Sequence, residues 1–150
     1  PYARINKVLS DRSDRQPGSA RKAADSMFEQ ISDQVPAGPL PVLSGCCGVQ
    51  PQLTEEHDFL KGLSAHGIDP AIRGVTSIFG NTLEAQFPLS VILASLAISR
   101  GAFFTPFDET GAEKEFSGQP DSVLISTWGH WRGESLALVE KPDAPLRGGE

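Results

Sequence analysis

Hydrophobic and polar positions divide the first part of the chain into a strand, a loop and a helix. Residues Tyr2–Ser10 alternate imperfectly between apolar and polar, and the polar run Asp11–Gly18 follows. This pattern predicts a strand and then a loop. Over Ser19–Val35 an apolar residue recurs every four positions, which is the spacing that lines one face of a helix. We therefore expect a surface helix there.

Two further pairs of strand and helix are predicted in the middle of the chain. The short apolar run Pro41–Leu43 indicates a buried strand that ends at Ser44. Thr54 and the two acids after it favour a helix start, because carboxylates are favourable near a helix N-terminus. Gly67 closes that helix, and the second apolar run Ile72–Phe79 predicts the next strand.

The most apolar segment of the chain predicts a long helix. Residues Leu89–Ser99 show little contrast between faces, as expected for a helix surrounded by protein. Pro88 is tolerated in a first turn but costs about 3 kcal/mol inside a helix, so the regular helix should begin near it. Gly101 ends the segment. We interpret it as the central buried helix of the fold.

The last third of the chain predicts a long loop and a hairpin. The polar stretch Asp108–Asp121 is expected to be mobile. Ser122–Thr127 and Leu136–Glu140 flank the turn residues Trp128–Glu134, which is the pattern of two antiparallel strands joined by a hairpin. The tail 141–150 is expected to fray.

This order of elements predicts an α/β fold with a mixed five-stranded sheet and helices on its faces. The 150 residues fit one domain, 1–150, and 39% hydrophobic with 21% charged residues is typical of globular proteins. No apolar run has the length of a membrane span, and no leader is recognisable. Adjacent Cys46 and Cys47 cannot easily form a disulfide, which favours a reducing cytoplasm. The net charge of −6 argues against a nucleic-acid surface.

Three turns that contain glycine follow predicted strands. They are Gly45–Pro51, Phe79–Leu83 and Trp128–Glu134. Open α/β folds bind their ligands beyond the carboxyl ends of the strands, so we expect these turns to meet at one end of the sheet.

In order and spacing, these turns resemble the C-terminal half of a β-ketoacyl-acyl-carrier-protein synthase of the thiolase superfamily, of the ketosynthase II type. Phe79-Gly80-Asn81, with the helix up to Gly101, is similar to the family's Gly-His pair and its long buried helix. Ser44–Pro51 resembles the His-Gly-Thr turn, and Trp128–Trp131 resembles the Phe-Gly-Phe-Gly-Gly hairpin. The resemblance covers most of the chain and implies the C-terminal half of a thiolase-like fold.

The resemblance also implies where the chemistry lies. In the family, a cysteine of the N-terminal half accepts the acyl chain from acyl-phosphopantetheine on a carrier protein, and two histidines of the C-terminal half support decarboxylation. The positional counterparts of the family site here are Cys46, Asn81 and His130. An Asn amide donates hydrogen bonds but cannot exchange a proton near neutral pH. No catalytic set is therefore intact, and the isolated chain is predicted to be inactive in condensation.

Several candidate residues have more than one interpretation. Cys46 is either a small residue in a tight turn or a nucleophile, although no histidine is close in sequence to activate it. His130 either replaces the phenylalanine that gates acyl access or is a structural residue of the hairpin. Phe103, Phe104 and Phe107 either line an acyl tunnel or pack in the core. No metal-ligand spacing and no phosphate-binding glycine pattern is present, so we expect the chain to bind no cofactor.

Two hypotheses for function follow, with a chance match of an unrelated α/β domain as a third. In the first, the chain is part of a synthase-like protein of fatty-acid or lipid-chain biosynthesis that shapes the acyl site. In the second, it is a non-catalytic partner that resembles a chain-length factor and binds a complete synthase. The expected partners are an N-terminal ketosynthase half or a second synthase subunit, in a homo- or hetero-oligomer. An exposed apolar patch should then mark the face that packs on the partner.

A second expected partner is the acyl-carrier protein, which is acidic. Basic residues are concentrated before residue 23, opposed there only by Asp11 and Asp14. They are Arg4, Lys7, Arg12, Arg15, Arg21 and Lys22. This cluster either receives an acidic partner or is simply a solvated strand and loop.

Overall fold

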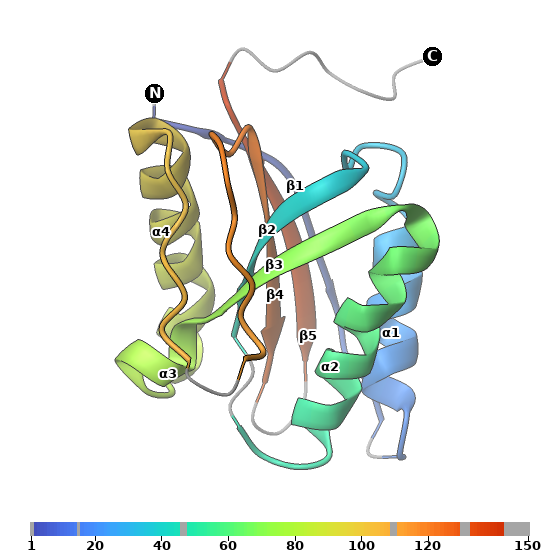
Figure 1. Cartoon of the computed structure of the whole chain (residues 1–150). Helices are drawn as coiled ribbons and strands as arrows, with labels where there is room; N and C mark the ends of the chain where they lie inside the picture. Colours follow the sequence, from blue (N-terminus) through green and yellow to red (C-terminus); the bar gives the residue numbers. More distant parts are fainter. Residues whose placement is uncertain (1, 15, 46–47, 109–110, 130–132, 143–150) are drawn as a thin grey trace.

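The computed structural model describes residues 2–14, 16–45, 48–108, 111–129 and 133–142. Its centre is one five-stranded sheet with the strand order β1-β5-β4-β2-β3 (Figure 1). The strands are β1 Arg4–Asp11, β2 Gly38–Ser44, β3 Ile68–Gly74, β4 Ser122–Trp128 and β5 Glu134–Glu140. β2 is parallel to β3 and β4, whereas β5 is antiparallel to β4 and β1. The predicted mixed sheet is confirmed.

Helices cover both faces of the sheet, which makes three layers (Figure 1). The helices are α1 Ser19–Glu29, α2 Gln52–Gly62, α3 Val75–Phe79 and α4 Gln86–Arg100. Side chains alternate along β4 because neighbouring residues of a strand point to opposite faces. Leu124 therefore joins the core beneath α1 and α2, while Val123 and Ile125 join the core beneath α4. None of the helices in the described ranges is long and apolar enough to cross a membrane.

The two helices of the first face differ from their predicted bounds. α1 ends at Glu29 rather than Val35, and a series of turns follows in which Gln34 N donates to Ile31 O. Ile31 and Val35 are nevertheless buried, so the apolar spacing continues although the helix does not. α2 begins at Gln52, before the predicted start at Thr54.

The prediction of a strand over Ile72–Phe79 was wrong. The strand β3 runs over Ile68–Gly74 instead, and Val75–Phe79 forms the short helix α3. Within β3, Pro70 donates no hydrogen bond to the ladder. β3 is an edge strand that pairs only with β2, and an edge tolerates proline.

α4 begins as predicted, with Pro88 in its first turn, and it ends at Gly101 in the left-handed conformation with φ 66°. Among the described residues, however, part of the surface of α4 stays open to solvent. Ala94 and Ile98 are buried against the sheet, whereas the side chain of Ile92 is 57% exposed. The helix is therefore not surrounded by protein in the chain alone.

The loop between α4 and β4 is attached to β3, although the sequence predicted mobility for Asp108–Asp121. It runs back along α4 and then returns across the front of the sheet (Figure 1). The buried Arg73 donates to the carbonyls of Phe104 at 2.7 Å and Lys114 at 2.8 Å. Burial lowers the pKa of Arg73, and the charges of Glu113 and Glu115 oppose that change. These contacts fix both arms of the loop on β3.

Candidate functional site

A cavity of about 450 Å³ lies at the carboxyl ends of β2 and β4, beside the start of α4. We call it the three-turn cavity because each predicted turn contributes to its wall: Gly45 from the first, Asn81 and Leu83 from the second, and Trp128 and Gly129 from the third. The structure therefore brings the described parts of the three turns together.

The first turn leaves β2 at Gly45, where the backbone is closely packed. Gly45 N donates to Ser126 O at 2.7 Å, which ties the end of β2 to β4. A Cβ at Gly45 would lie 3.0 Å from Thr127 Cγ2 and 3.1 Å from Gln86 Cγ. These distances are too short for ordinary carbon contacts, so the packing favours glycine at this position.

The second turn places Asn81 on the cavity wall. Its side-chain Oδ1 accepts a hydrogen bond from Leu83 N at 3.0 Å, an arrangement that Asn and Asp favour in turns. Leu83 has a φ of 51° and is the only non-glycine residue with a positive φ in the described ranges. Such a conformation costs free energy and is often found at functional sites. The Asn81 oxygen is thus used by the turn, while the amide nitrogen remains a donor.

Gln86, at the start of α4, is the polar side chain that sequence reasoning missed. It is only 6% exposed, and the Thr82 hydroxyl donates to its Oε1 at 2.9 Å. Its Nε2 is buried and has no acceptor among the residues that the structure describes. The available signal was a polar residue that opens a long apolar helix, four positions after a threonine.

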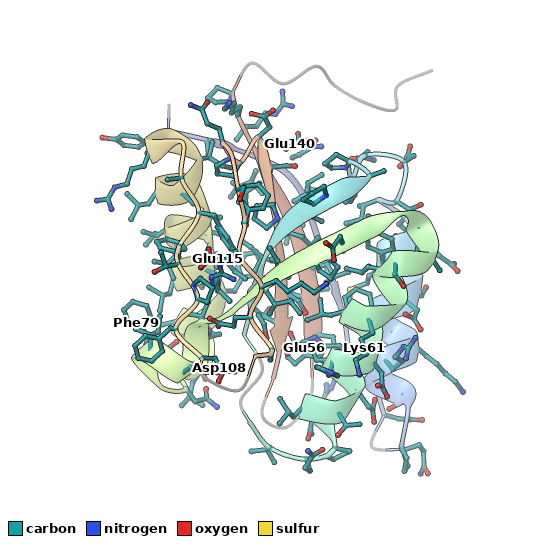
Figure 2. All side chains as sticks on the ribbon, in the orientation of Figure 1. Glu56, Lys61, Phe79, Asp108, Glu115 and Glu140 are labelled. Atoms are coloured by element: carbon teal, nitrogen blue, oxygen red, sulfur yellow. The ribbon has the colours of Figure 1, made fainter. Side chains whose placement is uncertain are left out.

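A second missed residue, Glu56 on α2, joins the helix to the strands that lead to the cavity. It is 2% exposed and accepts hydrogen bonds from the hydroxyls of Ser44 and Ser126, each at 2.8 Å. Trp128 Nε1 donates in turn to Ser126 Oγ at 2.7 Å. Figure 2 shows Glu56 between α2 and the sheet. The carboxylate thus holds the ends of β2 and β4, including a tryptophan that lines the three-turn cavity.

The structure tests some of the other predictions about site residues and leaves others open. Cys46 and His130 lie outside the described residues, so their roles stay predictions. Phe103 and Phe104 pack with the core beneath α4, with ring centroids 5.7 Å apart, as the core interpretation predicted. Phe107 is 63% exposed and takes no part in that packing.

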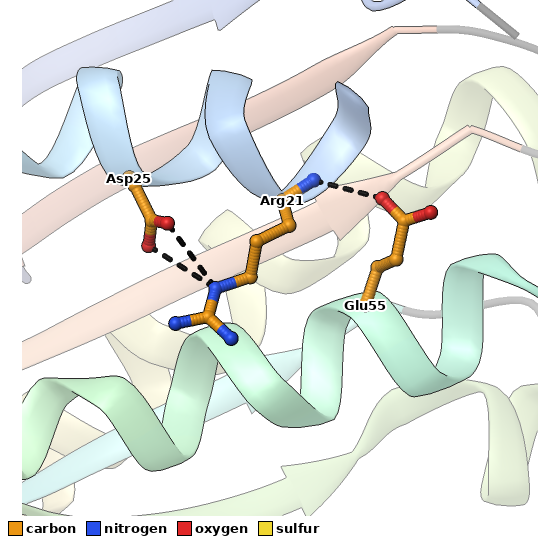
Figure 3. Close-up of polar contacts among 3 residues, drawn as sticks. All are labelled: Arg21, Asp25 and Glu55. Carbon is orange, nitrogen blue, oxygen red and sulfur yellow. Dashed lines mark hydrogen bonds and ion pairs between the residues drawn. The ribbon is translucent and has the colours of Figure 1, made fainter. Parts of the chain in front are cut away.

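Ion pairs occupy part of the predicted basic cluster. Arg4 pairs with Glu140 at 3.1 Å, and Arg21 pairs with Asp25 at 3.2 Å (Figure 3). Arg15 lies outside the described residues. The positive charge offered to an acidic partner is therefore smaller than the sequence count. In the part of the chain that the structure describes, no three His, Cys, Asp or Glu side chains gather as metal ligands would.

Comparisons with known proteins identify the fold. No family model and no curated protein matches the sequence. The structure is similar to the solved oxazolomycin ketosynthase domain of Streptomyces albus, with a TM-score of 0.67 and 16% sequence identity. The match covers 99% of this chain and 49% of that domain, so the chain spans about half the length of the domain that it matches. At this identity the likeness establishes the fold, and the chain accordingly has the α/β, thiolase-like fold of part of a ketosynthase domain.

Proposed function

We propose that the chain is the C-terminal part of a β-ketoacyl-acyl-carrier-protein synthase-like protein in fatty-acid or lipid-chain biosynthesis. In this role it shapes the acyl site but does not contain a complete catalytic set. The observation that carries the proposal is the three-turn cavity, which joins Asn81 to the ends of β2 and β4 in a ketosynthase-type fold.

The cavity has a lining suited to an acyl group. Leu83, Phe87 and Trp128 supply apolar surface, and the amides of Asn81 and Gln86 supply hydrogen-bond donors. Small-molecule sites typically combine a mostly apolar wall with a few placed polar groups in roughly 300–1,000 Å³. The proposed ligand is the acyl chain of an acyl-phosphopantetheine carried by an acyl-carrier protein, and the chain itself binds no cofactor.

The lack of a complete catalytic set follows from Asn81. Acyl transfer and condensation need an activated nucleophile and a group that exchanges protons near neutral pH. The Asn81 amide can stabilise a developing oxyanion as a donor, but it cannot act as an acid or base. The isolated chain therefore contributes binding and electrostatic stabilisation rather than condensation.

A partner covering the outer face of α4 completes the proposal. Exposed apolar side chains occur on α3, on the turn before α4 and on α4 itself: Ile78 is 54% exposed, Phe79 49%, Leu83 63% and Ile92 57%. Figure 2 shows Phe79 on α3, at the side of the molecule that α4 occupies. Large exposed apolar side chains on neighbouring elements are typical of an interface. We assign the face to an N-terminal ketosynthase half or a second synthase subunit.

Two assays on the purified chain test the proposal. Incubation with acyl- and malonyl-carrier protein should give no condensation product. Titration with decanoyl-pantetheine should give a saturable change in tryptophan fluorescence, because Trp128 lines the cavity. Formation of an elongated product would contradict the incomplete site, and the lack of saturable binding would contradict the acyl site.

The second candidate function is a non-catalytic partner that resembles a chain-length factor. It is favoured by Asn81, whose Oδ1 is held in the turn by Leu83 N and whose amide cannot transfer protons. Adding the chain to a complete ketosynthase discriminates the two functions. A changed product length supports the partner role, whereas an unchanged product and no complex favour the first function.

A further inference from the structure

Glu84 is the charged side chain of the three-turn cavity. The rest of the described lining is neutral and consists of glycines, apolar side chains, two amides and a threonine. Among the residues that the structure describes, Glu84 takes part in none of the ion pairs. The described lining also includes no Lys or Arg. Its net charge is therefore negative.

The turn before α4 fixes Glu84 at the cavity wall. Leu83 has a φ of 51° and begins the single 3₁₀ turn Leu83–Ala85. Asn81 Oδ1 accepts from Leu83 N at 3.0 Å, and Thr82 O accepts from Ala85 N at 3.0 Å. These two hydrogen bonds hold the backbone on either side of Glu84. The position of its charge is therefore set by the same turn that carries Asn81.

The charge of Glu84 also stands at the N-terminal end of α4. Glu84 directly precedes the N-cap Ala85, and no side chain caps the helix. The N-terminus of a long helix carries a partial positive charge and attracts anions. At this place Glu84 supplies an anion from the chain itself. An anionic ligand at the start of α4 would therefore meet Glu84 instead of an open helix end.

The size of the cavity decides how far this charge acts. A cavity of about 450 Å³ is roughly 10 Å across, which is about one Debye length in 0.1 M salt. A carboxylate inside it would therefore be repelled by Glu84, whereas a neutral acyl group would contact Leu83, Phe87 and Trp128 without that cost. Glu84 is exposed, so solvent weakens the repulsion and the expected effect is moderate.

We propose that Glu84 makes the three-turn cavity selective for neutral acyl groups over acyl groups that carry a carboxylate, such as malonyl. This inference rests on the proposed function, because it assumes an acyl ligand in the three-turn cavity. It goes further by naming the class of acyl group and the residue that determines it. Glu84 acts through its charge alone and takes no part in proton transfer.

Two thioesters of equal length test the proposal. Acetoacetyl-pantetheine ends in a neutral methyl ketone, and malonyl-pantetheine has a carboxylate in the same place. Backbone amide shifts of the isotope-labelled chain measure the affinity for each probe. At low salt the natural chain should bind the acetoacetyl probe about fivefold more tightly, as expected for like charges several ångströms apart near a protein surface. This preference should decrease as salt is added, because salt screens exposed charges.

Three variants separate the charge of Glu84 from other causes. Glu84→Gln removes the charge at similar size and should bind both probes equally. Glu84→Asp keeps the charge and should keep the preference. Glu29→Gln changes the net charge of the chain by the same amount at the end of α1, away from the described lining, and should also keep it. Both glutamates are exposed, so all three variants should fold as the natural chain does.

The outcomes separate this inference from the proposed function. Equal binding of both probes by the natural chain would overturn the role of Glu84 and leave an acyl site in place. A preference that persists in Glu84→Gln would do the same, because it would then arise from shape and not from charge. If neither probe binds, the role of Glu84 is overturned, and the titration with decanoyl-pantetheine decides separately on the acyl site.

Discussion

The side chain of Glu56 on α2 contacts the ends of both β2 and β4. Its buried carboxylate accepts from the hydroxyls of both Ser44 and Ser126. Glu56→Ala should lower the free energy of unfolding by about 3 kcal/mol, because two buried hydroxyls lose an acceptor and the wall packing loosens. Urea denaturation measures the change. Asp58→Ala, an exposed position on the same helix, is the control and should change it by less than about 0.5 kcal/mol. A similar small loss for both variants would contradict this role.

The role of Glu56 could not be predicted from the sequence because its burial and one of its partners depend on the tertiary fold. Glu56 lies on the same buried face of α2 as Phe59 and Leu60. Its helical spacing from these two residues was the only local sign that its carboxylate is buried. Its partner Ser126 is 70 positions away, and no local pattern connects them. By contrast, Asn81 was singled out by the resemblance of Gly80-Asn81 to the ketosynthase Gly-His pair, and the structure has it on the wall of the three-turn cavity.

The helix α1 receives its N-terminal cap from another helix. Its N-cap, Gly18, provides no side chain, and its first turn contains no acid. Glu55 on α2 takes that role, accepting from Gly18 N at 2.8 Å and from Arg21 N at 3.0 Å (Figure 3). Glu55→Ala should therefore cost about 1 kcal/mol of unfolding free energy, the usual value for a lost cap.

Asp25, which Figure 3 also shows, provides the control variant for the cap. Asp25 pairs with the Arg21 side chain, but the two side chains are 46% and 35% exposed, so solvent screens the pair. Asp25→Ala should cost less than about 0.5 kcal/mol in the same urea experiment. A larger loss for Asp25→Ala than for Glu55→Ala would show that the ion pair, and not the cap, stabilises this end of α1.

The carboxylate of Glu113 is a second anchor of the loop between α4 and β4, beside the contacts of Arg73. Glu113 accepts from Gly74 N at 2.8 Å on β3 and from Phe107 N at 2.6 Å in the loop. Glu113→Ala should make the segment 102–121 at least about threefold more sensitive to limited proteolysis, since local opening is controlled by such contacts. The exposed Glu115, labelled in Figure 2, provides the control Glu115→Ala. Equal cleavage rates in the two variants would contradict the anchoring role.

Local sequence patterns correctly predicted the elements whose ends are set by nearby turn residues or prolines. The hairpin strands and α4 with Pro88 in its first turn appear where turn residues and proline indicated. β3 was misplaced because its predicted bounds followed the apolar run Ile72–Phe79, whereas the strand begins at Ile68 and includes Pro70, which an edge strand tolerates. α1 was extended too far because Ile31 and Val35 keep the helical spacing while the backbone turns away.

The exposed face of α4 determines how the molecule should behave in solution. Ile92 is 57% exposed on a helix whose other face is buried in the core. Sedimentation velocity should show association that increases with concentration, because an apolar face is in contact with water. Ile92→Asp should shift the distribution to monomer, whereas Ser99→Asp, also exposed on α4, should not. A monomer at every concentration in the natural chain would contradict an interface on α4.

The central claim is that an acyl group binds where the three turns meet. Backbone amide shifts of the isotope-labelled chain, followed during titration with decanoyl-pantetheine, test this most directly. The largest shifts are predicted at Gly45, Asn81, Gln86 and Gly129, which line the three-turn cavity. Shifts confined to α1 and α2 on the opposite face of the sheet, or no shifts at all, would contradict it.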